Sequence, residues 1–320
     1  MLRRLSIQTR TPAELRQLAS ERRELAASKD GSIKALLLNE ARLLDFHAEL
    51  RAWIERTEAG HANHRLGGPE PRAAQPIPQD LVPFLTKLSS RMALPASDQH
   101  ALLAAALPPR HLARDEFIVD EGQHPSSLLF LCSGTARAAR TLEDGSQQIV
   151  AVFLAGDALN PGELVLGPSR TSICALAPAI ILEIPHPDLL FLMESRPAIM
   201  RALWRETALQ AAIQREWLIW LGQRPAETRL AHLLCEVSYR LQLGGGNCDA
   251  FEFPLTQREI ADTLGLSSVH VNRVLQLLRS RKLIDLNRSR LAIRDKPGLY
   301  AIAEFDPGYL DVSGPEEDEI

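Results

Sequence analysis

Apolar residues at helical spacing predict a helical hairpin over residues 1–58. The first helix begins at Thr11-Pro12, because proline suits the first helical position. Residues 29–32 interrupt the pattern before a second amphipathic helix. Two such helices bury little surface alone, so we expect them to pack on the rest of the chain or on another copy. The two apolar stripes consist of Leu15, Leu18 and Leu25, and then of Leu36, Leu37, Leu43, Leu44, Leu50, Trp53 and Ile54.

The periodicity is lost over residues 59–79, which hold three glycines and four prolines. This composition predicts a linker that is semi-stiff at its proline-rich end. His61 and His64 have a spacing that metal sites use, but no third ligand accompanies them, so we expect no metal site.

Short apolar or alternating runs dominate the next part of the chain, after a helix expected from Leu81 to Leu107. Residues 143–146, Glu-Asp-Gly-Ser, form a strong hairpin turn between two of the runs. Short strands at regular spacing predict an antiparallel β-roll over residues 80–195. The runs cover 117–119, 128–131, 135–142, 148–154 and 172–184, with Gly122, Gly134, Gly145 and Gly156 between them.

Helical spacing returns after Pro197 and predicts a long connecting helix over residues 196–222. An exposed stripe on such a helix would pair with its symmetry mate in a parallel homodimer. The alternative is that the stripe packs only on its own β-roll. Its members are Ile199, Leu203, Leu209, Ile213, Trp217 and Trp220.

A helix-turn-helix is predicted within residues 223–312, after a helix over 225–243 and a short strand over 251–255. Thr256 and Glu259 form a capping box at the start of its first helix. Gly265 supplies the left-handed residue of the turn. Ser267 caps the second helix, which Val271, Val274, Leu275 and Leu278 hold to the core.

The second helix, around Ser268–Arg279, presents polar side chains outward, and its first turns would enter the major groove. Arg273 can grip guanine O6 and N7, Asn272 can pair with adenine, and Val269 can pack on a thymine methyl. Two strands around residues 287–289 then predict a wing, whose Arg288 and Arg290 suit phosphate contacts. A winged helix used for protein contact is the alternative, but it would not need this run of arginines. The outward positions are Ser268, Val269, His270, Asn272, Arg273 and Gln276.

Charge and composition support a polyanionic partner. The 320 residues are 45% hydrophobic and 24% charged, with a net charge of −4. Residues 268–294 hold seven basic residues and one acid, whereas the seven acids from Glu304 onward meet no base. Charge alone would also fit a solvated face, so the argument depends on the helix-turn-helix beside it.

The four cysteines show no disulfide pattern, and no apolar run approaches 18 residues. We therefore expect a protein of the cytoplasm with no membrane segment.

Residues 81–310 resemble Crp/Fnr-type regulators in three motifs: LTQREIADTLGLSSVHVNRVLQLLR, GDALNPGELVLGPSRTSICAL and EFDPGYL. The resemblance implies an α+β fold, with a cyclic-nucleotide-binding-like β-roll, a dimer helix and a winged helix-turn-helix, followed here by an acidic tail over 313–320. Val269 stands where the best-known members have glutamate, which implies a different half-site. Residues 1–80 lie outside the resemblance. The resemblance to the family implies base contacts from Ser268, Val269, Asn272 and Arg273, and phosphate contacts from Thr256, Ser267, His270, Arg288 and Arg290.

The effector is left open by the sequence. Nucleotide-binding members use a Gly-Glu pair and an Arg followed by Ser or Thr, and Gly162-Glu163 and Arg170-Thr171 resemble these. The loop between them is about two residues short, and Arg170 falls one place late, which can aim it outside the pocket. We therefore favour an effector other than a cyclic nucleotide, and a regulator that responds to a cyclic nucleotide is the alternative. Another small ligand, no ligand, and a cysteine redox switch all remain open.

Iron–sulfur and haem motifs are absent from the sequence, so we expect no cofactor.

Other protein classes fit less well. The sequence has no nucleophile elbow, P-loop, zinc motif or dinucleotide fingerprint, so we expect no enzyme. An architectural DNA-binding protein would be small and strongly basic, and a sensor-like β-roll argues against that class. We expect a transcription regulator whose partners are double-stranded DNA, a second copy of itself and RNA polymerase.

Overall fold

The computed structural model describes residues 11–29, single positions between 31 and 44, and residues 94–243, 250–287 and 289–310. The chain forms two compact units, residues 1–76 and 77–320.

The first unit contains α1, Pro12–Ala27, which the predicted cap starts: Thr11 and Glu14 form a capping box. Its buried face holds Leu15, Ala19 and Ala26, whereas Leu25 is 44% exposed. The expected place of Leu25 on the apolar face is therefore wrong. Eleven residues bring a helix of 3.6 residues per turn back to the same face, but ten leave it well to one side. The second predicted helix lies mostly outside the described residues.

The β-roll of the second unit follows α4, Ala96–Ala105, and consists of two antiparallel sheets. One sheet has the order β1-β7-β3 and the other β2-β6-β4-β5, and apolar side chains from both form a shared core. The predicted run 172–184 is in fact two strands, and β1 was missed because it has only three residues. The strands are β1 Arg110–Leu112, β2 Phe117–Val119, β3 Ser127–Ser133, β4 Thr135–Thr141, β5 Gln147–Leu154, β6 Ser172–Ala175 and β7 Ala179–Pro185.

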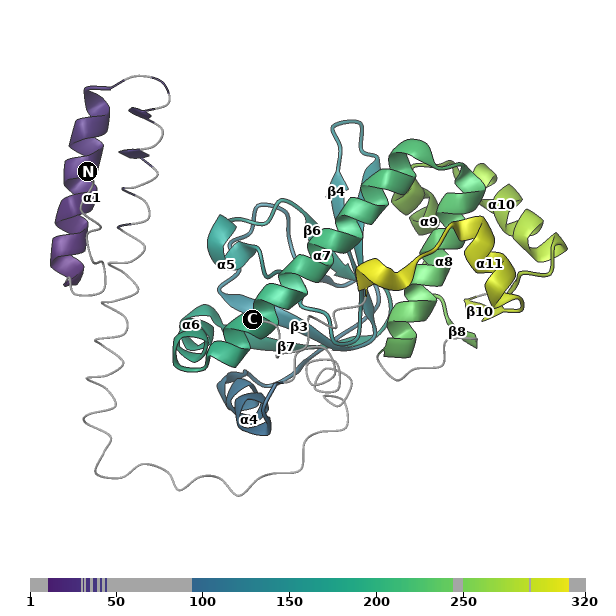
Figure 1. The fold of residues 1–320 in the computed structure, drawn as a ribbon, viewed down its shortest axis with the longest axis horizontal. Coiled ribbons are helices and arrows are strands. Elements are labelled where there is room, and N and C mark those ends of the chain that lie inside the picture. The colour runs from purple at the N-terminus through teal and green to yellow at the C-terminus, as the bar shows by residue number, and fades with distance from the viewer. Residues whose placement is uncertain are drawn as a thin grey trace. The chain divides into compact units, whose positions relative to one another are not determined.

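Three helices follow or interrupt the β-roll: α5 Glu163–Leu166, α6 His186–Ser195 and α7 Pro197–Gln223. The helical path breaks at Arg196, whose extended backbone (φ −136°, ψ 84°) precedes Pro197, as expected for a residue before proline. The long helix α7 runs across the β-roll and continues to the C-terminal domain (Figure 1).

The predicted dimer stripe on α7 faces its own chain. All six residues are at most 8% exposed. The first two join a cluster with β3 and β7, and the other four join the core of the C-terminal domain. The stripe therefore packs within its own chain, on the C-terminal domain as well as on the β-roll that the alternative named, and these side chains are covered without a partner. They are Ile199, Leu203, Leu209, Ile213, Trp217 and Trp220.

The C-terminal domain is a winged helix-turn-helix, and its small sheet has the antiparallel order β8-β10-β9. Tyr309, in the tail motif that resembled the family, donates from its hydroxyl to Glu236 Oε2 over 2.9 Å and so ties η3 to α8. The elements are α8 Ala226–Leu243, β8 Ala250–Glu252, α9 Gln257–Leu264, α10 Ser268–Ser280, β9 Ile284–Asn287, β10 Arg290–Ile293, α11 Lys296–Ala303 and the 3-10 helix η3 Pro307–Leu310.

One hydrophobic core joins this domain to the β-roll. Ile149, Val152 and Leu154 of β5 belong to the same buried cluster as the side chains of α8, α9 and α10. Polar contacts flank the joint: Gln148 Nε2 donates to Thr263 O over 3.2 Å. The two domains are thus packed on one another along β5 and α9.

Candidate DNA-binding surface and effector pocket

The helix-turn-helix is built by local signals that the sequence carries. Thr256 Oγ1 accepts from Glu259 N, and Glu259 Oε2 accepts from Thr256 N, which completes the predicted capping box. Gly265 ends α9 in the left-handed conformation, φ 63° and ψ 41°. Ser267 Oγ then accepts from His270 N over 3.2 Å and starts α10. These caps fix where α9 begins and ends and where α10 begins.

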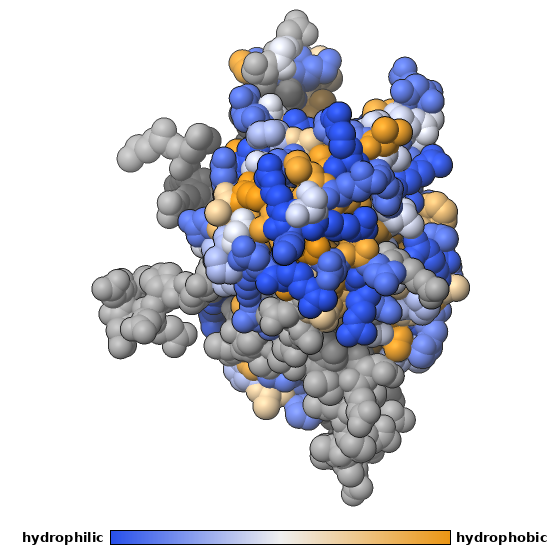
Figure 2. All heavy atoms as spheres, turned by 90° about the vertical axis from the view of Figure 1, so that its right-hand side faces the viewer, coloured by the Kyte–Doolittle hydropathy of each residue, from blue (hydrophilic) through white to orange (hydrophobic). Residues whose placement is uncertain are grey.

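The outward face of α10 is open to solvent. Val269 is 82% exposed, Ser268 and Arg273 are exposed, and His270 and Asn272 are half-buried. Figure 2 looks at the end of the molecule that carries α10 and α11 and shows hydrophilic side chains over most of this face, with hydrophobic ones between them. All four side chains expected to contact bases therefore lie on the accessible side of α10.

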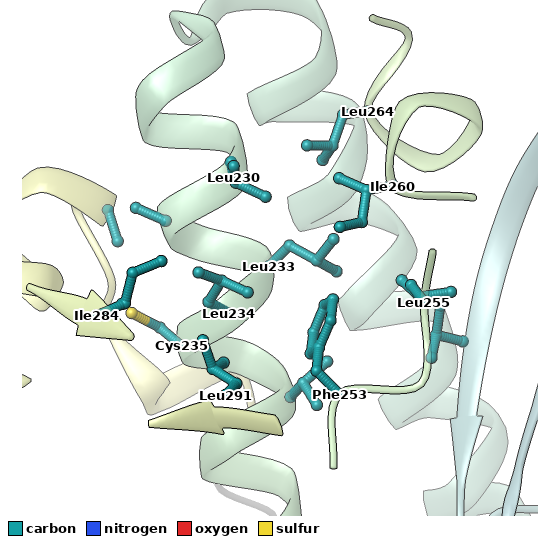
Figure 3. Close-up of a cluster of buried hydrophobic side chains, with 14 of the residues drawn as sticks. Leu230, Leu233, Leu234, Cys235, Phe253, Leu255, Ile260, Leu264, Ile284 and Leu291 are labelled. Carbon is teal, nitrogen blue, oxygen red and sulfur yellow. The ribbon is translucent and has the colours of Figure 1, made fainter. Parts of the chain in front are cut away.

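The inward face of α10 is apolar, as predicted, with Val271, Val274, Leu275 and Leu278 buried. The neighbouring part of the core is drawn in Figure 3, where Leu230 and Leu233 of α8 point toward Ile260 and Leu264 of α9. This packing fixes the angle at which α9 and α10 stand.

Asn272 belongs to a chain of amides on the surface. Its Nδ2 donates to Gln257 Oε1 over 3.1 Å, and its Oδ1 accepts from Gln276 Nε2 over 2.9 Å. Such a chain holds the Asn272 amide in one orientation, as pairing with a base edge requires. Gln257 is a residue that the sequence did not single out.

The seven basic residues of 268–294 have different roles. Arg279 Nη2 donates to Leu286 O over 2.7 Å and so fastens the wing to α10. Arg281 pairs with Glu227, and Arg294 pairs with Asp285. Among the described residues, Arg273, Lys282 and Arg290 make no ion pair and stay exposed. Arg288, the other expected wing contact, lies outside the described residues.

A pocket of about 320 Å³ lies between the β-roll, α5 and the middle of α7. Its apolar walls come from β5 and α7, among them Val152, Phe153, Leu209 and Ile213. A pocket of this size, with a few polar groups on apolar walls, is typical of small-ligand sites.

The predicted effector cassette is only partly at this pocket. Gly162, Glu163 and Thr171 line it, whereas Arg170 is exposed and is not part of its wall. Glu163 Oε1 accepts from Ser169 Oγ over 2.9 Å. The guanidinium that would bind a phosphate is thus outside the pocket wall, as expected from the sequence.

The pocket wall carries four charged side chains, and the sequence pointed only to Glu163 among them. Asp157, Glu206 and Arg240 are almost fully buried and reach the pocket from the β-roll, α7 and α8. The position of Glu206 was a usable signal, because it lies three residues from both Leu203 and Leu209, on the buried face of α7.

Cys132, Cys174 and Cys235 are buried. Burial raises the pKa of the Cys174 thiol and, much further, that of Cys235. A raised pKa disfavours the reactive thiolate, so Cys174 and Cys235 do not suit a redox switch.

The part of the chain that the structure describes holds no group of three His, Cys, Asp or Glu side chains placed to bind a metal ion. His61 and His64 lie outside it. No helix within the described ranges is both long and apolar enough to cross a membrane.

Two family models match the chain in the order the fold shows. The cyclic nucleotide-binding domain matches residues 109–196, and the Crp-like helix-turn-helix domain matches residues 228–302. The chain belongs to the Crp/Fnr family of transcription regulators. The expected fold and DNA-binding function are thereby confirmed.

Two similar proteins each match more than half of this chain. The transcriptional activator protein FnrA of Stutzerimonas stutzeri is 25% identical over 219 residues, which are 68% of this chain and 90% of the relative. The nitrogen fixation regulation protein FixK of Bradyrhizobium diazoefficiens is 27% identical over 194 residues, 60% of this chain and 81% of the relative. The solved structure of FixK2 from Bradyrhizobium japonicum superposes with a TM-score of 0.56 at 25% identity, covering 61% of this chain and 96% of that one.

Proposed function

We propose that this Crp/Fnr-type regulator acts as a homodimer in the cytoplasm, binds a palindromic DNA site and recruits RNA polymerase to nearby promoters. The observation that carries the proposal is the exposed outward face of α10, with Val269 and Arg273 open to solvent at its first turns. Its relatives FnrA and FixK are described as a transcriptional activator and a regulation protein. We infer activation here from that similarity.

The DNA contacts divide between bases and phosphates. Ser268, Val269, Asn272 and Arg273 read base edges, because they occupy the first turns of the recognition helix. The wing residues Arg288 and Arg290 meet the phosphate backbone. Thr256, Ser267 and His270, at the starts of α9 and α10, also face phosphates, because helix N-termini attract anions.

The dimer uses the outer face of α7 in place of the predicted stripe. Trp204 is 74% exposed and Leu218 is 71% exposed. Alternate steps of four and three residues along this face give the heptad seam of a two-stranded coiled coil. The seam consists of Trp204, Ala208, Ala211, Arg215, Leu218 and Gly222.

The seam is tested by light scattering coupled to size exclusion. Leu218→Glu places two like charges at the dimer axis, so we expect a monomer at micromolar concentration. Leu142→Glu, at an exposed leucine in the β4–β5 hairpin, is the matched control and keeps the dimer. A dimeric Leu218→Glu protein contradicts the seam.

Footprinting on genomic DNA tests the function as a whole. A dimeric regulator protects two half-sites about one helical turn apart, in a palindrome. Diffuse protection of all sequences at the same concentration excludes sequence-specific regulation and favours an architectural role.

The effector is not a cyclic nucleotide in this proposal, since Arg170 is exposed and the Glu163 carboxylate already accepts a hydrogen bond from Ser169. A buried phosphate needs a charge-assisted donor, and Arg170 does not reach the pocket wall. Calorimetry with cyclic AMP and cyclic GMP tests this point. Micromolar binding of either one, with a matching gain in DNA affinity, would falsify it.

A further inference from the structure

Glu206 is a buried carboxylate that forms no ion pair with any described residue. It is 3% exposed, and its Oε1 accepts two long hydrogen bonds of 3.4 Å, from Ala158 N and from Gln210 Nε2. Its Oε2 accepts no hydrogen bond from any described residue. Burying an ionised carboxylate is costly unless a counter-charge and short hydrogen bonds compensate it.

The pocket into which Glu206 faces is negative overall. Its wall holds the carboxylates of Asp157, Glu163 and Glu206 against the single guanidinium of Arg240. Arg240 already forms ion pairs with two other carboxylates. Its Nη2 lies 2.6 Å from Asp157 Oδ2, and its Nη1 donates to Glu236 Oε1 over 3.2 Å. Two carboxylates on the wall, those of Glu163 and Glu206, therefore have no cation among the described residues. A phosphate ligand would meet like charge here.

The rest of the wall suits an apolar body with a polar end. Phe153, Leu209 and Ile213 provide apolar surface, and Thr207 and Gln214 provide oxygen acceptors on the same helix as Glu206. An ammonium group has three donors and no acceptor, which matches an environment of carboxylate, amide and hydroxyl oxygens.

We propose that the pocket binds a small organic cation, a primary amine with an apolar body, whose ammonium group pairs with Glu206. This inference rests on the proposed function, because it names the class of effector for the same regulator. The cation supplies the counter-charge that none of the described residues places beside Glu206.

Calorimetry on the full-length protein tests the charge preference with three probes that share a phenyl ring: 2-phenylethylamine, 2-phenylethanol and phenylacetate. We expect the amine to bind about tenfold or more tightly than the alcohol, and phenylacetate not to bind, because charge-assisted hydrogen bonds exceed neutral ones. Equal binding of amine and alcohol, tighter binding of phenylacetate or cyclic AMP, or no binding of the amine at millimolar concentration overturns the proposal.

Glu206→Gln keeps the shape and removes the charge. We expect it to weaken amine binding about tenfold and to leave 2-phenylethanol within about twofold. Glu194→Gln removes an exposed carboxylate from α6 and is the matched control with unchanged amine binding. An unchanged amine affinity in Glu206→Gln overturns the assigned contact.

The melting temperature without ligand gives a second readout. Glu206→Gln removes an uncompensated buried charge, so we expect it to raise the melting temperature by about 2–4 °C. Glu236→Gln should lower it, since Glu236 is paired with Arg240 and accepts from Trp217 and Tyr309. A fall in Glu206→Gln as large as that in Glu236→Gln would mean that Glu206 is already satisfied, against the proposal.

DNA binding measured on the same preparation separates the two claims. Specific binding to a palindromic site without any amine binding refutes only the cation pocket. If the protein binds no DNA site specifically, the proposed regulatory function is refuted, whether or not the amine binds.

Discussion

Arg240 Nη2 lies 2.6 Å from Asp157 Oδ2, and this buried ion pair joins the DNA-binding domain to the β-roll. Arg240 Nη1 also donates to Val152 O over 3.1 Å and to Glu236 on its own helix. Asp157 in turn accepts from Leu154 N. The guanidinium thus connects α8, the end of β5 and the pocket wall.

Arg240→Ala should strongly destabilise the protein. The change leaves Asp157 and Glu236 buried without their cation, and breaking a buried pair in this way costs about 3–5 kcal/mol. Urea unfolding of the full chain, followed by tryptophan fluorescence, measures the loss. The matched control is Arg281→Ala, which removes an exposed pair with Glu227 and should cost about 0–1 kcal/mol. Equal effects of the two variants would contradict the role of Arg240.

Substitution of Arg273 and substitution of Arg290 should change DNA binding in different ways. Arg273→Ala is expected to cost about 1–3 kcal/mol at the specific site and to relax base preference at one position, because it loses a base contact. Arg290→Ala should weaken binding to all sequences and reduce the salt slope by about one, because it loses a phosphate contact.

Competition binding against randomised half-sites at several salt concentrations separates these outcomes. An equal loss on random DNA for Arg273→Ala, or a changed base preference for Arg290→Ala, would contradict the assignment.

Gly265 tests the turn between α9 and α10. A Cβ at this position has space, with Leu221 Cδ2 at 3.8 Å, so the cost of Gly265→Ala comes from the left-handed backbone. We expect a loss of about 1–2 kcal/mol in the free energy of unfolding. Gly265→Asn should lose less, since asparagine tolerates this conformation. Should both variants unfold at the wild-type urea concentration, backbone strain would not govern this turn.

His232 makes stability depend on pH. Burial lowers its pKa from 6.5 to about 4, so the folded protein holds the neutral imidazole. A lowered pKa gives stability that is present above pH 6.5 and is lost as the pH falls from 6.5 toward 4. The full loss from this group is about 3 kcal/mol, measured as the free energy of unfolding at a series of pH values.

His232→Gln provides the control for that series. Glutamine cannot titrate, so the difference in stability between the two proteins should shrink toward low pH. Parallel curves across this range would show that His232 is not the group responsible.

The helix-turn-helix was predictable because its signals are local. Thr256, Gly265 and Ser267 act within three or four residues of their own position, and the structure uses each of them as expected. The strands on either side of the 143–146 turn were predictable for the same reason.

The orientation of α7 was not predictable, because two apolar faces compete on it. The stripe through Trp217 and Trp220 is the longer one, and it was interpreted as the dimer face. In the fold it belongs to a buried cluster with β5, which lies much earlier in the chain, and with α8, which is the next helix. The shorter face, with Trp204 and Leu218, is the one that stays open.

The charged residues of the pocket wall could not be predicted from the sequence, because they depend on contacts between distant segments of the chain. Asp157, Glu206 and Arg240 come from three elements and meet only in the folded chain. The sequence did predict that Arg170 lies outside the pocket, but Arg170 lies in the bend before β6, so strand alternation is not the reason.

The core shared by β5 and the helix-turn-helix limits how this protein can be recombined. Consider a chimaera that joins the DNA-binding domain to another sensor domain at residue 223. It would lose β5, and the apolar side chains of α9 that now pack in one cluster with Ile149, Val152 and Leu154 would become exposed. The transferable module is therefore larger than the helix-turn-helix: a successful graft must bring the inner face of β5, or an equivalent apolar surface, from the recipient.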